Sequence, residues 1–360
     1  MPLFFAMLKR LVLSNLRSFD DADIVLTSGL NLIVGDNGSG KTTLLEAIYL
    51  LFRGRSFRHR EISPLIKDGQ MQYQLFTEFL GKAGENHRLG LQQDKQNTLI
   101  KLDGETAKRR SDIIHLLPIE WIGPDPQALI TDEPEGRRAF IDNGLFHVEH
   151  DYLSIVQKYH RALDQRNASL KKNLNAMTWD QQLVEYGSEI QQRRSSYLKR
   201  LITYIEDQLN DWTLDIEVTL SYQRGWSEEL SLLDALKKNL ETDRKRKFTS
   251  VGPHRADLVI KAGDKRSSRK LSRGQLKMLV AAMHLAQTRY RIDAGFSPGI
   301  LLIDDLPAEL DQTNKNRLIS AGNELFPQMI IVSLSEAEIP KLNQSVNTIH
   351  VSRGTVIKSC

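Results

Sequence analysis

The segment Gly35 to Thr42 constrains the fold of this 360-residue chain more than any other part of its sequence. It reads GDNGSGKT, follows an apolar stretch at Asn31 to Val34, and precedes an amphipathic helix expected from about Thr42 to Phe52. Glycines let a backbone curl until successive N–H groups point at one anion, and the positive end of the following helix faces the same place. The sequence therefore predicts an α/β fold with a phosphate-binding loop between a strand and a helix.

The residue types in this loop also predict what it holds. The ammonium of Lys41 would bridge the β- and γ-phosphates of ATP, and the hydroxyl of Thr42 would enter the coordination shell of Mg²⁺. We therefore expect ATP and Mg²⁺ as cofactors. The residues expected to contact them here are Gly35, Asp36, Asn37, Gly38, Ser39, Gly40, Lys41, Thr42 and Thr43.

Two adjacent acids, Asp304 and Asp305, form the second feature. The apolar residues 300–303 before them are typical of a buried parallel strand, and parallel sheets bind ligands at the carboxyl ends of their strands. Because neighbouring strand residues point to opposite sides, we expect the acids to have different roles. Asp304 would meet Mg²⁺ through water, and Asp305 would act as general base or orient the attacking water. The predicted catalytic residues are thus Lys41, Asp304 and Asp305, although two acids alone are also typical of a solvated strand end.

The third feature is LSRGQ at residues 271–275, which opens a helix expected over 272–290 with Ser272 as its N-cap. On its own this pattern indicates only a capped helix. Its place before the Asp304 strand, and the following AELD at 308–311, make it similar to the signature motif and D-loop of ABC-type ATPases. The resemblance implies that Ser272, Gly274, Gln275 and Asp311 contact an ATP held by a second copy of the chain, so that a homodimer encloses two ATPs.

Longer segments resemble one family of this class, the RecF recombination mediators. They are LSNLRSFD, GRSFR, WIGPDPQALITDEPEGRRAFID and SVGPHRADL, and together with the three motifs they run in the family's order from residue 11 to 311. The glycine that the family usually carries near Asp132 and Glu133 is missing, which affects the local loop. Asp305 agrees with the family, whereas transport ATPases carry glutamate there, and its shorter side chain implies slow turnover of ATP.

The resemblance implies a head related to those of the Rad50 and SMC proteins, and a role in recombinational repair and replication restart. RecF-like proteins dimerise around ATP, bind duplex DNA next to single-stranded gaps and, with RecR, assist the loading of RecA. We accordingly expect a weak, DNA-stimulated ATPase that is not a nuclease. The alternative is the ATPase subunit of an ABC transporter, which the inserted helical region and the RecF-like segments disfavour.

Charge and composition bear on the partner and the compartment. The net charge is only +4, from 49 basic and 45 acidic residues, but basic residues cluster at 53–60, 108–110, 244–247 and 265–273. Each cluster alone is typical of a solvated surface, whereas four together favour an anionic partner such as DNA. One cysteine, Cys360, excludes a disulfide within the chain. Neither a secretory signal nor an apolar run of about 18 residues is apparent, so we expect a cytoplasmic protein without membrane contact.

Three regions of the chain differ in their expected structure. Residues 1–123 and 248–360 alternate strands with helices, whereas 124–247 is mostly helical. We expect one ABC-type P-loop ATPase head, made of a mixed sheet plus an antiparallel β meander, that both ends of the chain build together. A mostly helical second lobe interrupts it.

Five further residues keep two interpretations each. His254 and Arg255 are either phosphate or DNA contacts, or residues that pack and fix a turn. Gln127 competes with other positions in 121–130 for the role of the Q-loop. Ser333 stands where ABC-type enzymes often have a histidine that senses the γ-phosphate, and Arg58 either reaches a phosphate or stays solvated.

Overall fold

A computed structural model describes residues 6–59, 61–107, 111–149, 151–214, 217–262, 265–266, 270–305, 310–340 and 345–357. The chain forms two compact units. The first unit combines Met1–Pro126 with Gly295–Cys360, and the second comprises Gln127–Ala294. Every helix in the described part of the chain is too short or too polar to span a bilayer.

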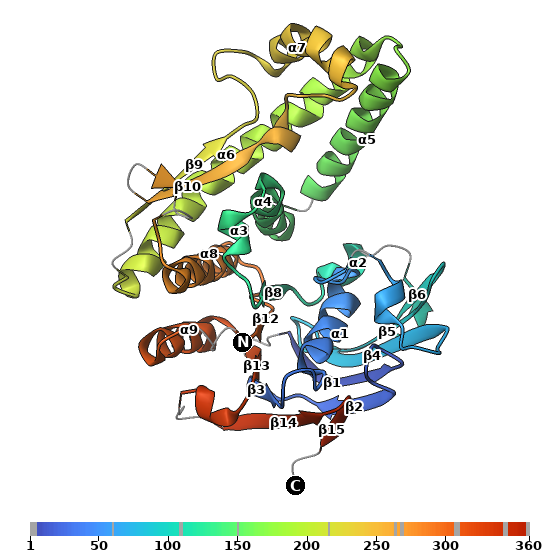
Figure 1. Ribbon diagram of the computed structural model, residues 1–360, viewed down its shortest axis with the longest axis vertical. Coiled ribbons are helices and arrows are strands. Elements are labelled where there is room, and N and C mark those ends of the chain that lie inside the picture. Colours follow the sequence, from blue (N-terminus) through green and yellow to red (C-terminus); the bar gives the residue numbers. More distant parts are fainter. Residues whose placement is uncertain are drawn as a thin grey trace. The chain divides into compact units, whose positions relative to one another are not determined.

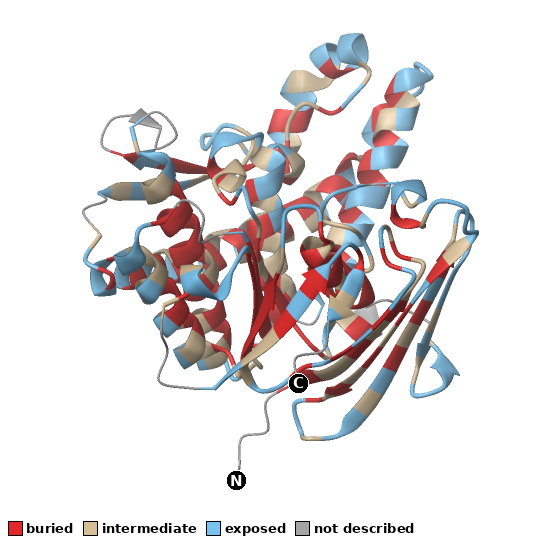
Figure 2. Cartoon of the chain, turned by 60° about the horizontal axis from the view of Figure 1, so that its bottom comes forward, coloured by how far each residue is buried: buried red, intermediate tan, exposed pale blue. Residues whose placement is uncertain are grey.

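The first unit contains an antiparallel sheet with the strand order β2-β1-β4-β5-β6-β7. Its strands are β1 (Met7–Ser14), β2 (Asp21–Val25), β4 (Gln72–Leu80), β5 (Asn86–Asp94), β6 (Thr98–Leu102) and β7 (Glu105–Thr106). Buried residues alternate with more exposed ones along β4 and β5 (Figure 2), because one face of the sheet covers the core and the other faces solvent. The expected antiparallel meander is confirmed, because β4, β5 and β6 pair in the order of the chain.

A second, mixed sheet in this unit has the order β15-β14-β3-β13-β12-β8. Its strands are β3 (Gly29–Val34), β8 (Ile119–Ile122), β12 (Ile300–Asp304), β13 (Gln328–Ser333), β14 (Val346–Ser352) and β15 (Thr355–Ile357). The strands from β14 to β8 are parallel, and β12 and β13 are buried along their whole length. Figure 1 shows β3 next to the late strands β13 and β14, so that both ends of the chain build one sheet.

Helix α1 (Lys41–Arg53) packs between the two sheets of the first unit. Its residues Leu44 and Ile48 belong to one hydrophobic core with residues of both sheets, and the ring of Phe52 meets that of Phe79 edge-on at 5.3 Å. This packing holds the start of α1, and the loop before it, at the carboxyl end of β3. The other helices among the described residues of this unit are α2 (Ser111–Ile114), α9 (Gln312–Leu325), η1 (Ser63–Leu65) and η6 (Glu336–Glu338).

The second unit is mostly helical. Its helices are α3 (Ala128–Thr131), α4 (Pro134–Val148), α5 (Tyr152–Lys171), η2 (Ala176–Trp179), α6 (Asp180–Asp211), α7 (Leu232–Arg246), η3 (Pro253–Arg255) and α8 (Arg273–Asp293). A three-stranded sheet with the order β11-β10-β9 accompanies them, formed by β9 (Val218–Gln223), β10 (Asp257–Ala262) and β11 (Lys265–Arg266). Helices α5 and α8 both pack along the long helix α6 (Figure 1).

Buried arginines join the helices of the second unit. The guanidinium of Arg166 is fully buried and pairs with Asp180 at 2.8 Å and with Asp243 at 2.7 Å, which links α5, α6 and α7. Arg194 of α6 pairs with Asp142 of α4 at 2.8 Å. Each charge is thereby matched inside the unit, as burial requires.

One boundary of the two units differs from the regions expected from the sequence. The first unit is interrupted after Pro126, close to the expected end of the first region, but residues 248–294 lie in the second unit and not in the head. The physical reason is that β10 pairs with β9 and α8 packs on α6. The Tyr290 ring lies 5.2 Å from that of Tyr197, and the Tyr204 hydroxyl donates to Asp293 at 2.8 Å.

Candidate nucleotide-binding site

The phosphate-binding loop expected from the sequence connects β3 to α1, and two of its glycines have no room for a side chain. At Gly35, where φ is 156°, a β-carbon would lie 2.1 Å from the carbonyl oxygen of Val351. At Gly40, where φ is 110°, it would lie 2.6 Å from the ring of Phe19. The path of the loop therefore depends on glycine, and α1 begins directly after it, so the unbonded N–H groups of its first turn face the loop.

The residues expected to contact the nucleotide differ in their exposure. Asp36, Asn37 and Gly38 form the exposed crest of the loop, whereas Ser39 is buried. Thr43 is buried in the first turn of α1. The crest is thus open to solvent, whereas the first turn of α1 is fixed against the core.

Two buried polar groups mark the loop as an anion site. The ammonium of Lys41 donates to the carbonyl oxygens of Gly35 and Asp36, at 2.6 and 2.9 Å. Burial lowers the pKa of Lys41, and the nearby carboxylates Asp305 and Asp304 oppose that shift. The hydroxyl oxygen of Ser39 is buried and has no hydrogen-bond partner among the described residues. Because buried polar atoms normally have a partner, the loop fits a ligand that carries phosphate oxygens.

Asp304 ends the strand β12 and faces the phosphate-binding loop. Its Oδ1 accepts a hydrogen bond from the Thr42 hydroxyl at 3.1 Å, between residues 262 positions apart in the chain. Burial raises the pKa of Asp304 to about 6, which the hydrogen bond from Thr42 and the charge of Arg58 partly counteract. A hydroxyl and a carboxylate oxygen beside a phosphate site are the ligand types that Mg²⁺ prefers.

Asp305 is exposed and leaves the strand with a left-handed backbone, at φ 50°. The two acids therefore lie in different environments, but not because neighbouring strand residues alternate, since β12 ends at Asp304. The charge of Asp305 acts on both Lys41 and Asp304, so its carboxylate lies on the same side as the loop. Residues 306–309, which include Ala308 and Glu309 of the expected D-loop, lie outside the described residues.

Ser333 ends β13 beside the same site, where its hydroxyl donates to the carboxylate of Glu338. The same carboxylate accepts from the N–H of Leu334 at 3.2 Å, and its charge is a minor one among those that oppose the lowering of the Lys41 pKa by burial. Sequence reasoning did not single out Glu338, because no motif surrounds it. Arg58 is exposed, yet its charge reaches Asp304, which places it on the site's side of the loop that follows α1.

Glu46, on the buried face of α1, is a second residue that sequence reasoning missed. Its carboxylate is fully buried, accepts from Arg17 at 2.5 and 3.0 Å, and also accepts from the hydroxyl of Ser56. It thereby ties the segment before β2 and the segment after α1 to the helix that carries Lys41. The sequence did contain a signal for this role, because Glu46 is a charged residue on the face of an amphipathic helix that covers the core.

The expected signature residues lie at the start of α8, in the second unit. Ser272 is the N-cap: its hydroxyl accepts from the N–H of Gln275 at 3.2 Å, and the Gln275 side chain accepts from the N–H of Ser272 at 2.9 Å. A β-carbon at Gly274 would meet open space. The helix therefore presents an exposed N-terminus with a small residue in its first turn, which is the type of surface that attracts an anion.

Two of the remaining residues have evident structural roles. His254 is neutral and packed: its Nε2 donates to the Thr249 carbonyl at 3.0 Å, its Nδ1 accepts from the Tyr159 hydroxyl at 2.7 Å, and burial lowers its pKa to about 4. Asp311 caps α9 by accepting from the N–H of Asn314 at 2.8 Å. The packed interpretation of His254 is thus confirmed.

The alternative interpretations of Arg255 and Gln127 both remain predictions. Arg255 is exposed, with its guanidinium 5.0 Å from the ring centre of Phe248. Gln127 begins the second unit, and its side-chain oxygen is buried without a hydrogen-bond partner among the described residues. The basic run at 108–110 and the side chains of residues 265–269 lie outside the described residues.

Comparison with known proteins places this site in a family. The family described as RecF/RecN/SMC N terminal domain matches residues 7–357. The DNA replication and repair protein RecF of Hydrogenovibrio crunogenus is 38% identical over 338 residues, which are 92% of each chain. RecF of Shigella flexneri serotype 5b is 34% identical over 336 residues, which are 92% of this chain and 94% of that protein.

Solved structures agree. A recombination mediator protein RecF of the RecFOR pathway, solved with ATP, superposes with a TM-score of 0.88 at 25% identity over 99% of both chains. The Smc head domain of Pyrococcus furiosus superposes with a TM-score of 0.59 at 18% identity over 98% of this chain and 95% of that one, and so shares the fold. The chain belongs to the RecF family of DNA replication and repair proteins, an ATP-binding family whose heads have the ABC-type ATPase fold.

Proposed function

We propose that this protein is an ATP-gated DNA-binding protein of recombinational repair and replication restart in the cytoplasm, which dimerises around ATP and binds duplex DNA at single-strand gaps. The hydrogen bond between Thr42 and Asp304 carries the proposal, because it joins the first turn of α1 to the acidic end of β12. Lys41 lies next to it, and the hydroxyl of Ser39 lacks a partner among the described residues. These groups suit a triphosphate with its metal ion.

ATP and Mg²⁺ would be held by separate parts of this site. The N–H groups of residues 35–43 and the Lys41 ammonium would hold the phosphates, and Thr42 with Asp304 would hold Mg²⁺. The metal ion would neutralise charge that develops on the phosphates. Mg²⁺ would also keep Asp304 ionised, because a nearby dication lowers the pKa that burial raises.

Hydrolysis would depend on Asp305. The carboxylate is exposed and near both Lys41 and Asp304, so it can orient a water molecule or accept its proton. The Asp305 side chain is one methylene shorter than that of glutamate, which fits a slow ATPase that DNA stimulates. We assign Asp305 this role and not any role in cutting DNA.

The second half of each nucleotide site would come from another copy of the chain. Ser272, Gly274 and Gln275 form the start of α8 in the second unit, whereas the phosphate-binding loop belongs to the first. Asp311, the last residue of the expected D-loop, is exposed. A helix dipole and hydrogen bonds to phosphate contribute about 1–3 kcal/mol each. Several such contacts on two ATPs suffice for a dimer that dissociates when the γ-phosphate leaves.

The expected partners follow from the family. Closing two copies would bring basic residues together on one surface that binds DNA phosphates without regard to sequence. With RecR, the protein would then assist the loading of RecA at the gap. Binding of this kind requires no helix or strand that reads bases.

Light scattering with and without ATP and Mg²⁺ tests the dimer. Wild type should double its mass with ATP, and Lys41→Arg and Ser272→Arg should stay monomeric. Ser231→Arg is the matched control, because Ser231 caps α7 in the same way, by accepting from the N–H of Asp234 at 3.1 Å. Both cap substitutions cost about 1 kcal/mol of stability, so only a loss confined to Ser272→Arg reports on the nucleotide. An ATP-driven dimer of Ser272→Arg would refute the shared site.

Gel-shift binding at several salt concentrations tests the gating. Gapped duplex should bind more tightly with ATP and Mg²⁺ than without, and more tightly than blunt duplex. Equal affinity in all these conditions would refute both the gating by ATP and the preference for gapped DNA.

A further inference from the structure

One end of the second unit gathers two basic runs that are far apart in the sequence. Helices α5 and α7 end side by side, where the Lys247 ammonium donates to the Asn173 side chain at 2.5 Å. Just behind, Thr249 donates twice to the Asn167 side chain, at 2.8 Å each, and the buried Arg166 holds α7 through Asp243. We call this surface the basic tip; it consists of Lys171, Lys172, Arg244, Lys245, Arg246 and Lys247.

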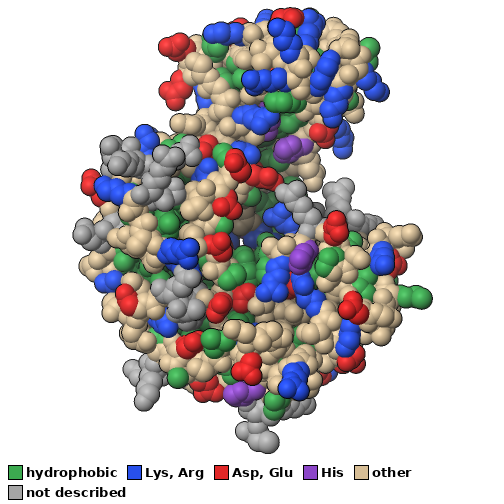
Figure 3. All heavy atoms as spheres, in the orientation of Figure 1, with side chains coloured by type: hydrophobic (Ala, Val, Ile, Leu, Met, Phe, Trp, Pro, Cys, Tyr) green, Lys and Arg blue, Asp and Glu red, His purple; other side chains and the backbone are tan. Residues whose placement is uncertain are grey.

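The basic tip carries more charge than the fold needs. Cations at the C-terminus of a helix commonly offset its partial negative charge, which is about half an elementary charge. Two helix ends therefore account for about one of the positive charges, and Glu241, which pairs with Arg244 at 2.7 Å, accounts for another. Roughly four positive charges remain unmatched, and all members of the tip except Lys247 are classed as exposed. Figure 3 shows Lys and Arg side chains gathered over this end of the unit.

Lys247 also has a backbone conformation that a lysine adopts at a cost. It is the C-cap of α7 with φ 63°, in the left-handed region, where helices usually end in glycine because other residues strain the backbone by roughly 1 kcal/mol. The ammonium of Lys247 is held at the end of α7 by its hydrogen bond to Asn173. Strained residues that a fold tolerates are often found at binding sites.

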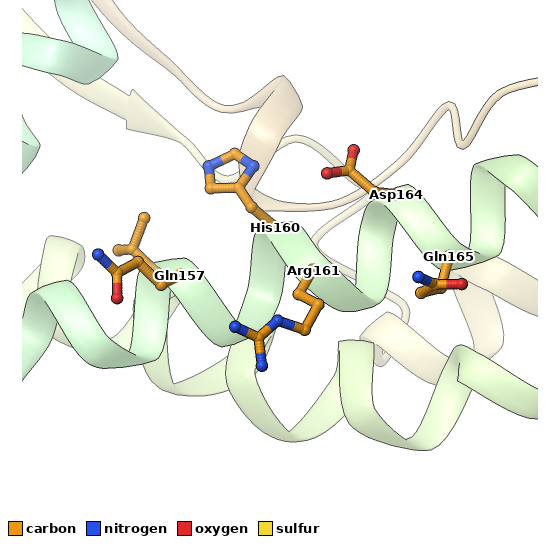
Figure 4. Close-up of a pocket in the computed structure, with 6 residues that line it drawn as sticks. Gln157, His160, Arg161, Asp164 and Gln165 are labelled. Atoms are coloured by element: carbon orange, nitrogen blue, oxygen red, sulfur yellow. The ribbon is translucent and has the colours of Figure 1, made fainter. Parts of the chain in front are cut away.

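The outer side of α5 extends the surface toward its middle. Figure 4 shows Gln157, Arg161 and Gln165 along one side of the helix, around a shallow hollow, with His160 and Asp164 on the adjoining side. Residues four positions apart lie one above the other on a helix, so this row of hydrogen-bond donors leads toward Lys172. Asp164 is the only acid within α5.

We propose that the basic tip and this row of α5 bind the sugar–phosphate backbone of duplex DNA, an inference that rests on the proposed DNA-binding function. The chemistry is suited to it: several unmatched cations lie on two fixed helix ends, and amide donors follow along α5. Such contacts release counterions, so affinity falls with salt by a slope of about 0.9 for each phosphate neutralised. The tip would therefore add about two to four to that slope.

The test compares three pairs of adjacent, exposed cations on the same unit. Two double variants each remove half of the free charge of the tip. They are Lys171→Gln with Lys172→Gln, and Lys245→Gln with Arg246→Gln. Lys199→Gln with Arg200→Gln, on the half of α6 that packs against α8, is the control with the same change of net charge. Binding to gapped duplex with ATP and Mg²⁺ should weaken at least fivefold in each tip variant and lose about one to two from its salt slope. The control should stay within twofold of wild type.

Lys247→Gly separates a structural from a binding role. Glycine relieves the left-handed strain, so the melting temperature should stay the same or rise, while DNA affinity falls severalfold. Unchanged affinity in this variant would overturn the role assigned to Lys247.

Different results would refute this proposal and the DNA-binding function on which it rests. Wild type that binds no DNA under any condition would refute the DNA-binding function and the tip with it. Wild type that binds DNA, with tip variants equal to it in affinity and salt slope, would overturn the tip alone; the cations would then serve another anionic surface, such as an acidic protein.

Discussion

Replacing Asp304 by asparagine should make the nucleotide-free protein more stable while it abolishes metal-dependent ATP binding. Burial raises the pKa of this carboxyl from its ordinary 3.8 to about 6, so above pH 6 the folded protein holds a buried carboxylate that would be better solvated in the unfolded chain. The difference corresponds to roughly 3 kcal/mol of lost stability. An asparagine side chain has the same shape, and its oxygen can still accept from Thr42, although a neutral acceptor is weaker by about 1 kcal/mol. We therefore expect a net gain of about 2 kcal/mol at pH 8.

The sign of the pH dependence follows from the raised pKa. Below the unfolded pKa the carboxyl is protonated in both states and costs nothing; the penalty grows as the pH rises through the interval from about 4 to 6 and is complete above it. The advantage of Asp304→Asn should therefore be large at pH 8 and smaller by about 2 kcal/mol at pH 4.5. Thermal unfolding should show a rise of about 4–8 °C at pH 8, since 1 kcal/mol shifts a unit of this size by about 2–4 °C.

The transition to follow is the one that ATP with Mg²⁺ raises in wild type, because a ligand stabilises the unit that binds it. The same addition should leave Asp304→Asn unshifted. Asp305→Asn is the matched control: the residue is exposed and left-handed, a conformation that asparagine tolerates, so its stability should change by less than about 0.5 kcal/mol. An Asp304→Asn protein that is less stable than wild type at pH 8, or equally shifted at both pH values, would refute the reasoning.

Three other changes test the site and the frame around it. Asp305→Asn should bind ATP as wild type does but release no phosphate; turnover near the wild-type rate would place the base elsewhere. Gly40→Ala should weaken nucleotide binding at least tenfold in a titration, because its β-carbon would enter the ring of Phe19; wild-type affinity would show that the loop can move aside. Arg166→Met should lower the urea midpoint by the equivalent of about 3–5 kcal/mol, because it leaves two aspartates buried without their cation; a loss below 1 kcal/mol would mean that water reaches them.

Most of the elements that build the site could be predicted from the sequence. The strands and helices around the phosphate-binding loop and Asp304 carry strong patterns, because a buried parallel strand is uniformly apolar and a loop that wraps a phosphate needs glycine at set positions. The capped start of α8 was equally visible, since Ser272 and Gln275 form a reciprocal pair three residues apart. These are local properties, and a sequence records them directly.

What could not be predicted depends on contacts between distant segments. Strand β8 has only four residues, Ile119–Ile122, without alternation, and becomes a strand because β12 pairs with it. Glu338 becomes part of the site only because β13 brings Ser333 beside the loop. The assignment of α8 to the second unit likewise follows from tyrosines that meet across α6 and α8, and no periodicity in either helix reveals that choice.

The position of β3 has a consequence for how the protein is made. This strand emerges early from the ribosome, yet both of its neighbours, β13 and β14, are among the last segments to be synthesised. The side chain of Gln328 completes the same connection by bonding to the backbone of Leu8 and Thr27. Since domains tend to fold as they emerge, the continuous second unit can mature first while the earlier-made segment waits. A translation product truncated before β13 would lack both neighbours of β3, and could not complete the sheet that holds the phosphate-binding loop.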